Sequence, residues 1–220
     1  MNISSQSFNK FFHSDFWPES LFINDYPALV MVWNLLLLAI PFYLFMFLYK
    51  YWRVNKFKRH SQKIVAVMLG FLWLLFIPNT AYLITDIRHL INYCPLEFSN
   101  AICPEGAWMI MLFFTYSSIG WVAFVILLNQ MKEFIERIWG KKISNIFIWL
   151  LIPLISLGVL IGLVDRWNSW DFFLHPILIF KSLLMYVNNV IYFRNWVVFT
   201  IGLYILYHGG DWLFSRKINR

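Results

Sequence analysis

Long uninterrupted blocks of apolar residues dominate the hydrophobic pattern of this chain. Five of them are 20 residues or longer: 27–49, 64–84, 107–131, 145–164 and 192–214. A helix of about 20 apolar residues crosses the ~30 Å of hydrocarbon in a bilayer. The pattern therefore predicts an all-α, polytopic membrane helix bundle with five transmembrane helices.

Two further apolar stretches do not have the pattern of a span. Residues 176–190 are short for a span and carry Lys181 in their middle, so we expect an interfacial or re-entrant helix on the outer face. Residues 1–26 are expected to form an amphipathic segment on the same face. Their aromatic residues recur at helical spacing: Phe8, Phe11, Phe12 and Phe16.

Composition narrows the class of protein. Of the 220 residues, 60% are hydrophobic and only 13% are charged. Soluble domains are roughly a quarter charged, so a soluble enzyme, a disordered chain and a secreted disulfide scaffold are excluded. With no repeat or linker, we expect one transmembrane domain over 27–214, preceded by the 1–26 segment and followed by a basic tail at 215–220.

The charge of the connecting segments predicts the orientation. Thirteen of the 18 Lys and Arg residues lie in 50–63, 132–142 and 215–220, which five spans place on one side. Because basic connections stay in the cytoplasm, we expect the N-terminus outside and the C-terminus inside. The net charge of +7 then requires no nucleic-acid partner. The 50–63 loop either binds anionic lipid, in addition to the bilayer itself, or serves only to set topology.

The two cysteines fall in one predicted outer loop. Cys94 and Cys103 are expected to form a disulfide, with two free thiols as the alternative. Two thiols without a nearby His pair do not make a zinc site, so no metal is expected. The chain also has no GxxxxGK[ST], HExxH or GxSxG motif, and no cofactor is predicted.

A polar stripe marks the end of the second span. Pro78 removes a backbone donor, so we expect a kink there. Beyond it, four polar side chains fall within a sector about 80° wide on a regular helix: Asn79, Tyr82, Asp86 and His89. Thr85 and Arg88 fall outside that sector.

Two interpretations of this stripe stay open. Asp86 and His89 are one turn apart, so they could act together in a ligand or substrate site, or as metal ligands. Alternatively, the stripe is an ordinary helix end, where Asn79 bonds the carbonyl of Leu74 that Pro78 frees and the charged groups are solvated.

A second polar cluster follows the fourth span. Gly158 and Gly162 are spaced for close helix packing. Arg166 carries a planar donor fork that suits carboxylate or phosphate. Asp171 is expected to cap or to begin the next helix. The residues between them are typical of turns and headgroup interfaces: Trp167, Asn168, Ser169 and Trp170. We expect the two clusters to converge in space.

Both clusters resemble the signatures of a known family. FIPNTAYLITDIRHL is similar to FLPN-x-PY-(I/L)-x-TD-(I/L)-x-HL, and DRWNSWDFFLHP to R-(W/x)-NSWD, in the uncharacterised bacterial membrane family called domain of unknown function 1361. The resemblance covers roughly residues 30–215. Thr80-Ala81 departs from the Ala-Pro that is frequent in the family. The resemblance implies a multi-pass protein of the bacterial inner or plasma membrane and brings no known activity or cofactor. It nominates Pro78, Asn79, Tyr82, Thr85, Asp86, His89, Arg166, Asn168, Ser169, Trp170 and Asp171 as shared features.

Three functions fit these observations. The first is binding or translocation of a small polar or lipid-like solute by an outward-facing site made of Asn79, Tyr82, Asp86, His89, Arg166, Asn168 and Trp170. The second is a membrane enzyme acting on a lipid or cell-envelope substrate, with His89, Asp86 and Asp171 as candidate catalytic residues. The third is a non-catalytic assembly factor.

Overall fold

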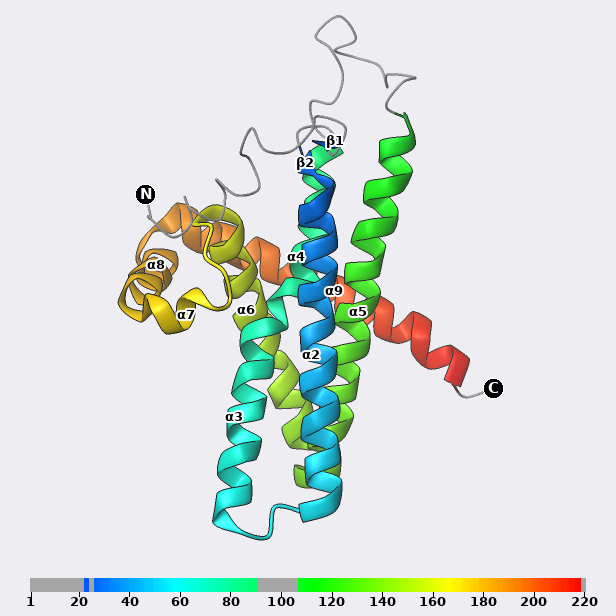
Figure 1. Cartoon of the computed structure of the whole chain (residues 1–220), viewed down its shortest axis with the longest axis vertical. Coiled ribbons are helices and arrows are strands. Elements are labelled where there is room, and N and C mark those ends of the chain that lie inside the picture. The colour runs from blue at the N-terminus through cyan, green and yellow to red at the C-terminus, as the bar shows by residue number, and fades with distance from the viewer. Residues whose placement is uncertain (1–21, 24–25, 91–106, 219–220) are drawn as a thin grey trace, which may run out of the picture.

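The computed structural model describes residues 22–23, 26–90 and 107–218 (Figure 1). The predicted disulfide and almost all of the predicted N-terminal segment lie outside these residues. Apart from a short antiparallel pair, β1 (Phe22–Ile23) and β2 (Tyr26–Pro27), the described chain is helical. The helices are α2 (Ala28–Asn55), α3 (His60–Phe76), α4 (Pro78–Thr85), the 3-10 helix η2 (Asp86–Leu90), α5 (Ala107–Trp139), α6 (Lys141–Val164), α7 (Asp171–Leu174), α8 (Pro176–Asn188) and α9 (Val190–Ile218).

The five predicted spans are confirmed as helices long and apolar enough to cross a membrane. They are α2, the composite of α3, α4 and η2 over His60–His89, α5, α6 and Val190–Phe214 of α9. With 13 residues, α8 is about 20 Å long and too short to span. The fold class, an all-helical bundle with five candidate spans, is therefore as the sequence predicts.

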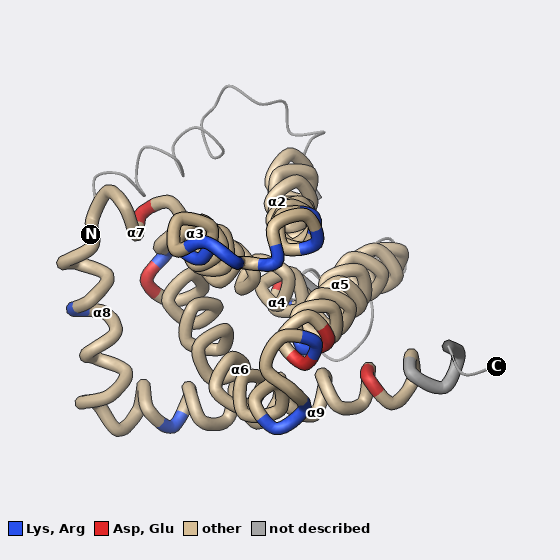
Figure 2. The backbone as a smooth tube through the Cα atoms, turned by 90° about the horizontal axis from the view of Figure 1, so that it is seen from below, with Lys and Arg blue, Asp and Glu red and all other residues tan. Residues whose placement is uncertain are grey.

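The long helices divide into two directions. Helices α2, α3 and α5 run side by side along the long axis, whereas α9 crosses the bundle at a steep angle (Figure 1). Seen along the bundle, α8 and α9 meet at a sharp corner and pass around α6 (Figure 2). The α6–α7 connection and α8 thereby lie against the side of the bundle, next to α6.

The centre of the bundle is packed between α4, α5 and α6. Its fully buried side chains include Ile77, Phe124, Leu127 and Ile155. Helices α4 and α5 approach closely at Gly120, where an added Cβ would lie 2.7 Å from the Thr80 carbonyl oxygen. Since hydrocarbon gives apolar helices little reason to associate, close packing at such small residues is what holds spans together.

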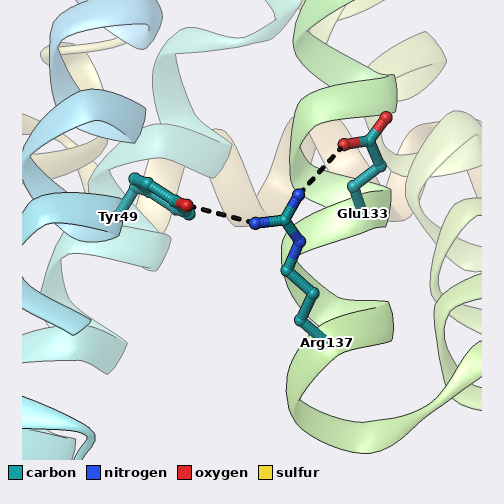
Figure 3. A network of polar contacts seen from close by, with 3 residues as sticks. All are labelled: Tyr49, Glu133 and Arg137. Carbon is teal, nitrogen blue, oxygen red and sulfur yellow. Dashed lines mark hydrogen bonds and ion pairs between the residues drawn. The ribbon is translucent and has the colours of Figure 1, made fainter. Parts of the chain in front are cut away.

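Basic residues gather at one end of the bundle. Viewed from that end, Lys and Arg mark the α2–α3 connection and the α5–α6 junction (Figure 2). There Arg137 donates to the Tyr49 hydroxyl at 3.1 Å and lies 3.8 Å from a Glu133 oxygen (Figure 3). This exposed network contributes little energy. The grouping is the one expected of a cytoplasmic end, and the orientation itself stays a prediction.

Candidate functional site

Pro78 divides the second span into two helices. Helix α3 ends at Phe76, and α4 starts at Pro78 and runs in a different direction (Figure 1). Two side chains satisfy carbonyls at the break: Asn79 Nδ2 donates to the Phe76 oxygen at 3.0 Å and Thr80 Oγ1 to the Ile77 oxygen at 2.7 Å. The predicted kink is confirmed. Asn79 does bond a carbonyl at the break, although it is that of Phe76 rather than Leu74.

The α6–α7 connection is a turn held by a buried carboxylate. Asp171, only 2% exposed, accepts hydrogen bonds from the Asn168 backbone nitrogen at 2.8 Å and from Asn168 Nδ2 at 3.2 Å. Of the two predicted alternatives, Asp171 begins helix α7 rather than capping it. Just before the turn, Arg166 adopts a left-handed backbone conformation with φ of 61°. Such a conformation is costly for a residue with a Cβ and is frequent at functional sites.

The two polar clusters meet in space. Asn79 Nδ2 also donates to Ser169 Oγ at 3.2 Å, which joins α4 directly to the turn. The predicted close packing at Gly158 and Gly162 is confirmed, and the partner helix is α4. A Cβ at Gly158 would lie 2.8 Å from Pro78 Cγ; one at Gly162 would lie 3.3 Å from the Trp167 carbonyl oxygen of the turn and 3.8 Å, an ordinary contact distance, from the Tyr82 ring. These glycines let the turn reach the polar stripe.

A cavity of about 550 Å³, here called the α4–α6 cavity, lies where the clusters meet. Its polar wall includes Asn79, Tyr82, Arg88, His89, Arg166, Asn168 and Ser169. Its apolar wall comes from α2, α3, α6 and α8 and includes Leu37, Phe71, Leu74, Leu154, Leu157 and Leu183. No Asp or Glu lines it among the residues that the structure describes. A cavity of this size and mixed lining is typical of a small-molecule site.

Two guanidinium groups dominate the charge of the polar wall. Arg88 lies near enough to the Tyr82 hydroxyl to interact with it, and its Nε lies 3.5 Å from His89 Nε2. Both Arg88 and Arg166 act electrostatically on His89 as well as on Tyr82. The polar end of the cavity is therefore positively charged and rich in hydrogen-bond donors.

Arg88 corrects an expectation from the sequence. A regular helix would place Arg88 away from the polar stripe, but the chain tightens into the 3-10 helix η2 at Asp86. A 3-10 helix turns 120° per residue instead of 100°, which rotates Arg88 by about 40° towards Tyr82. His89 lies in the wall too and stacks on Phe113 with ring centroids 5.9 Å apart.

Three of the candidate residues lie outside the cavity wall. Asp86 is 1% exposed and sits behind the wall, and Asp171 is buried inside the turn. Trp170 packs edge-on against Trp33, with ring centroids 6.3 Å apart. The other candidates, Asn79, Tyr82, His89, Arg166 and Asn168, all line the cavity.

Sequence reasoning missed the contribution of α2. Trp33 and Asn34 line the cavity, and Trp33 also packs against Trp170 of the turn. Asn34 is a polar residue within a long apolar run, so its side chain is a signal that the sequence did contain. A tie to α8 was not predicted either: Trp167 Nε1 donates to Ser182 Oγ at 3.2 Å.

A second buried polar pair lies beside the turn. Asp165 Oδ2 and the Tyr186 hydroxyl are both buried, and neither has a hydrogen-bond partner among the described residues. Burial raises the pKa of the Asp165 carboxyl above its usual value. Burial and the nearby Asp165 charge raise the pKa of Tyr186. In the described part of the chain, no three His, Cys, Asp or Glu side chains are grouped as metal ligands would be.

Comparison with known families supports the resemblance seen in the motifs. A family model described as "Protein of unknown function (DUF1361)" matches residues 33–207. The chain belongs to this family. Both DUF1361 signatures lie within the matched range, as does nearly all of the α4–α6 cavity wall. No curated protein and no solved structure matches the chain.

Proposed function

We propose that this protein binds an anionic amphiphile, a lipid-like molecule with an acidic headgroup, in the α4–α6 cavity at the outer face of a bacterial cell membrane. One observation carries the proposal: the cavity has two guanidinium groups at one end and apolar walls at the other.

The polar end suits a phosphate or carboxylate headgroup. Arginine forks donate two parallel hydrogen bonds to such groups, and both Arg88 and Arg166 line the wall. The Tyr82 hydroxyl and the Asn168 amide add neutral donors nearby. Because no described wall residue is acidic, an anion entering the cavity would contact no carboxylate directly; Asp86 acts on Tyr82 from behind the wall. The anion would neutralise two cations that are expensive to hold at the membrane boundary.

The apolar end suits a hydrocarbon tail. Phe71, Leu74 and Leu157 continue the wall towards the middle of the bundle. Leu154 lines the same wall and is 52% exposed on the lipid-facing surface, so the cavity opens sideways to the bilayer. A small hydrophilic anion would leave this wall unused, whereas each methylene buried there adds about 0.8 kcal/mol.

The test compares acidic and neutral lipids on the full-length protein in detergent. Phosphatidylglycerol, a prenyl phosphate and oleate represent three sources of the acidic headgroup, and phosphatidylcholine is the control. We expect at least one acidic amphiphile to raise the melting temperature more than phosphatidylcholine does. Arg166→Gln and Arg88→Gln should remove that increment, whereas Arg194→Gln, exposed on α9 and outside the cavity wall, should keep it. Equal increments in all three variants would refute the proposal.

A second candidate function rests on the position of His89. Its imidazole lies in the polar wall beside Arg88, where it would reach a bound headgroup and could act as a general acid or base. Mass spectrometry of the acidic lipids after incubation with wild type and His89→Ala distinguishes the two functions. A product formed only by wild type identifies an enzyme, and unchanged lipids with both proteins leave binding as the function.

A further inference from the structure

A second cavity lies at the basic end of the bundle. It has a volume of about 670 Å³ and is lined by residues of α2, α3, α5 and α6. We call it the basic-end cavity. Its walls are almost entirely apolar and include Trp73, Met131 and Leu151, while Lys56 and Lys63 are its only charged lining residues in the described chain. No function discussed above uses it.

The α2–α3 connection is built so that it closes this cavity with cationic groups. Lys56 and Phe57 both have φ of 51°, two consecutive left-handed residues that turn the chain back towards α3. The turn is fixed by Gln62, whose Nε2 donates to Asn55 Oδ1 at 3.1 Å and whose Oε1 accepts from the Arg59 backbone nitrogen at 3.0 Å. Both Lys56 and Phe57 line the cavity.

The cationic rim also has an aromatic partner. Lys56 Nζ lies 4.1 Å from the centre of the Trp52 ring, and Trp52 lines the cavity as well. Trp and Lys together are typical of the headgroup level of a membrane protein. Every other charged residue of the connection is basic, so the rim lies in a positive field.

The cavity is open to the hydrocarbon between α3 and α6. Three of its lining side chains are strongly exposed: Val67 at 70%, Leu150 at 64% and Leu154 at 52%. These apolar side chains face the region that lipid occupies if α3 and α6 span the membrane. An acyl chain could therefore enter sideways without passing the lysines.

We infer that the basic-end cavity binds one anionic phospholipid of the leaflet on that side, with its phosphate between Lys56 and Lys63 and an acyl chain among the apolar walls. This site is separate from the outer site proposed above and does not depend on it. The lysines select the charge of the headgroup, and the apolar walls select a lipid over a soluble anion.

The structure also indicates how the two cavities relate. They share Leu74 and Leu154 in their walls, so their apolar ends adjoin. Between Lys63 and Asn79, no residue of α3 or α4 in either wall is charged. A headgroup crossing this stretch would lose its hydration without gaining a partner. These walls therefore fit two separate lipid sites whose acyl chains adjoin better than they fit a path that carries a headgroup from one cavity to the other.

The first test removes the charge of the rim. Native mass spectrometry of the full-length protein should show phosphatidylglycerol retained in preference to phosphatidylcholine. Lys56→Ala with Lys63→Ala should weaken retention roughly thirtyfold, because each lysine near a lipid surface contributes to anion binding. Lys58→Ala with Lys141→Ala removes two exposed lysines from the same end but outside the cavity and should have little effect. Equal losses in both double variants would overturn the inference, since they would indicate only diffuse attraction.

The second test fills the cavity. Gly70 lines it, and a Cβ there would have no atom within 4 Å, so Gly70→Leu extends into open space. Gly202→Leu has equally free surroundings on α9, outside the cavity, and is the matched control. Loss of bound phosphatidylglycerol only in Gly70→Leu supports the site. Equal retention in the two variants overturns it, as does a dimer mass in wild type that Gly70→Leu converts to monomer, because a second copy would then occupy the groove.

Both tests are carried out in wild type and also in a protein that carries Arg88→Gln and Arg166→Gln. Loss of the outer site in that background leaves the basic-end site measurable, so failure of one proposal is distinguishable from failure of the other. If the lysine double variant does not fold, Gly70→Leu decides the question.

Discussion

The Asn79 side-chain amide donates to the Ser169 hydroxyl at 3.2 Å across 90 residues of sequence. The same Asn79 nitrogen also donates to the Phe76 carbonyl at the helix break. The Asn79 side chain thus bonds a carbonyl at the Pro78 break and also links the α6–α7 turn to α4. This bond helps to position the Arg166 turn relative to α4, together with the close packing of Gly158 on Pro78.

Replacing Ser169 and replacing Asn79 should lower the free energy of unfolding by different amounts. Ser169→Ala loses one hydrogen bond and should lower the free energy of unfolding by about 1 kcal/mol. Asn79→Ala also leaves the Phe76 carbonyl without its donor and should cost about 2–3 kcal/mol. Denaturant titration in detergent measures both, and the double variant should show a coupling of about 1 kcal/mol. Strict additivity would contradict a direct Asn79–Ser169 bond.

Gly120 is expected to be intolerant of any side chain. Gly120→Ala would place a Cβ 2.7 Å from the Thr80 oxygen and 2.5 Å from Leu83 Cβ, which forces α4 and α5 apart. We expect a loss of about 1–3 kcal/mol in unfolding free energy. Gly202→Ala has no atom within 4 Å of its new Cβ and should be neutral or up to about 1 kcal/mol more stable. A Gly120→Ala protein that melts like Gly202→Ala would mean that α4 and α5 are farther apart.

Two substitutions at Arg166 distinguish the effect of its left-handed backbone conformation from the effect of its charge. Arg166→Gly and Arg166→Ala both remove the guanidinium group, but only glycine adopts φ of 61° without strain. We therefore expect the glycine variant to be more stable than the alanine variant by about 1 kcal/mol. Both should lose the stabilisation by acidic amphiphiles. Thermal melts with and without lipid measure both effects, and an alanine variant as stable as the glycine variant would argue against the strained turn.

Asp165 should make stability depend on pH. Its folded-state pKa is raised by burial, so in the window above the ordinary Asp value the folded protein binds more protons than the unfolded one. Stability is then greatest below the unfolded pKa of about 3.9 and falls as the pH rises through the folded pKa. Asp165→Asn should raise the melting temperature at pH 7, and the gain should shrink towards pH 4.

Asp171→Asn is the matched control for that experiment. The Asp171 carboxylate accepts two hydrogen bonds from Asn168 in a buried turn, so its replacement should destabilise the protein at pH 7. The expected loss is about 2 kcal/mol. A gain in melting temperature for both variants would show that simple charge removal, rather than the environment of Asp165, is responsible.

The sequence predicted the spans well because hydrocarbon imposes one requirement on all of them. It placed the second span at 64–84, against His60–His89 in the structure. Helix ends were less visible: α2 continues to Asn55 and α5 to Trp139, past the apolar residues into basic ones. The change from apolar to basic residues indicates where a span leaves the lipid. It does not indicate where the helix ends, because the backbone stays helical beyond that point.

The candidate site was predicted in outline only. The convergence of Asn79 with Ser169 agrees with expectation from the two motifs. Arg88 was missed because a regular helical period cannot reveal the change to a 3-10 helix at Asp86. Trp33 was missed because local spacing holds no information on which distant helix packs against the turn.

Helix α9 carries a carboxylate into the bundle, and this bears on how the protein is made. Asp211 accepts a hydrogen bond from Asn129 Nδ2 at 2.9 Å, and Tyr207 donates to Asn129 Oδ1 at 2.7 Å. A segment with an acidic side chain enters lipid reluctantly on its own. Asn129 lies 82 residues earlier in the chain, so α5 is synthesised before α9. The last span can thus enter the membrane against a helix that already offers its carboxylate a donor, which makes α5 a template for completing the bundle.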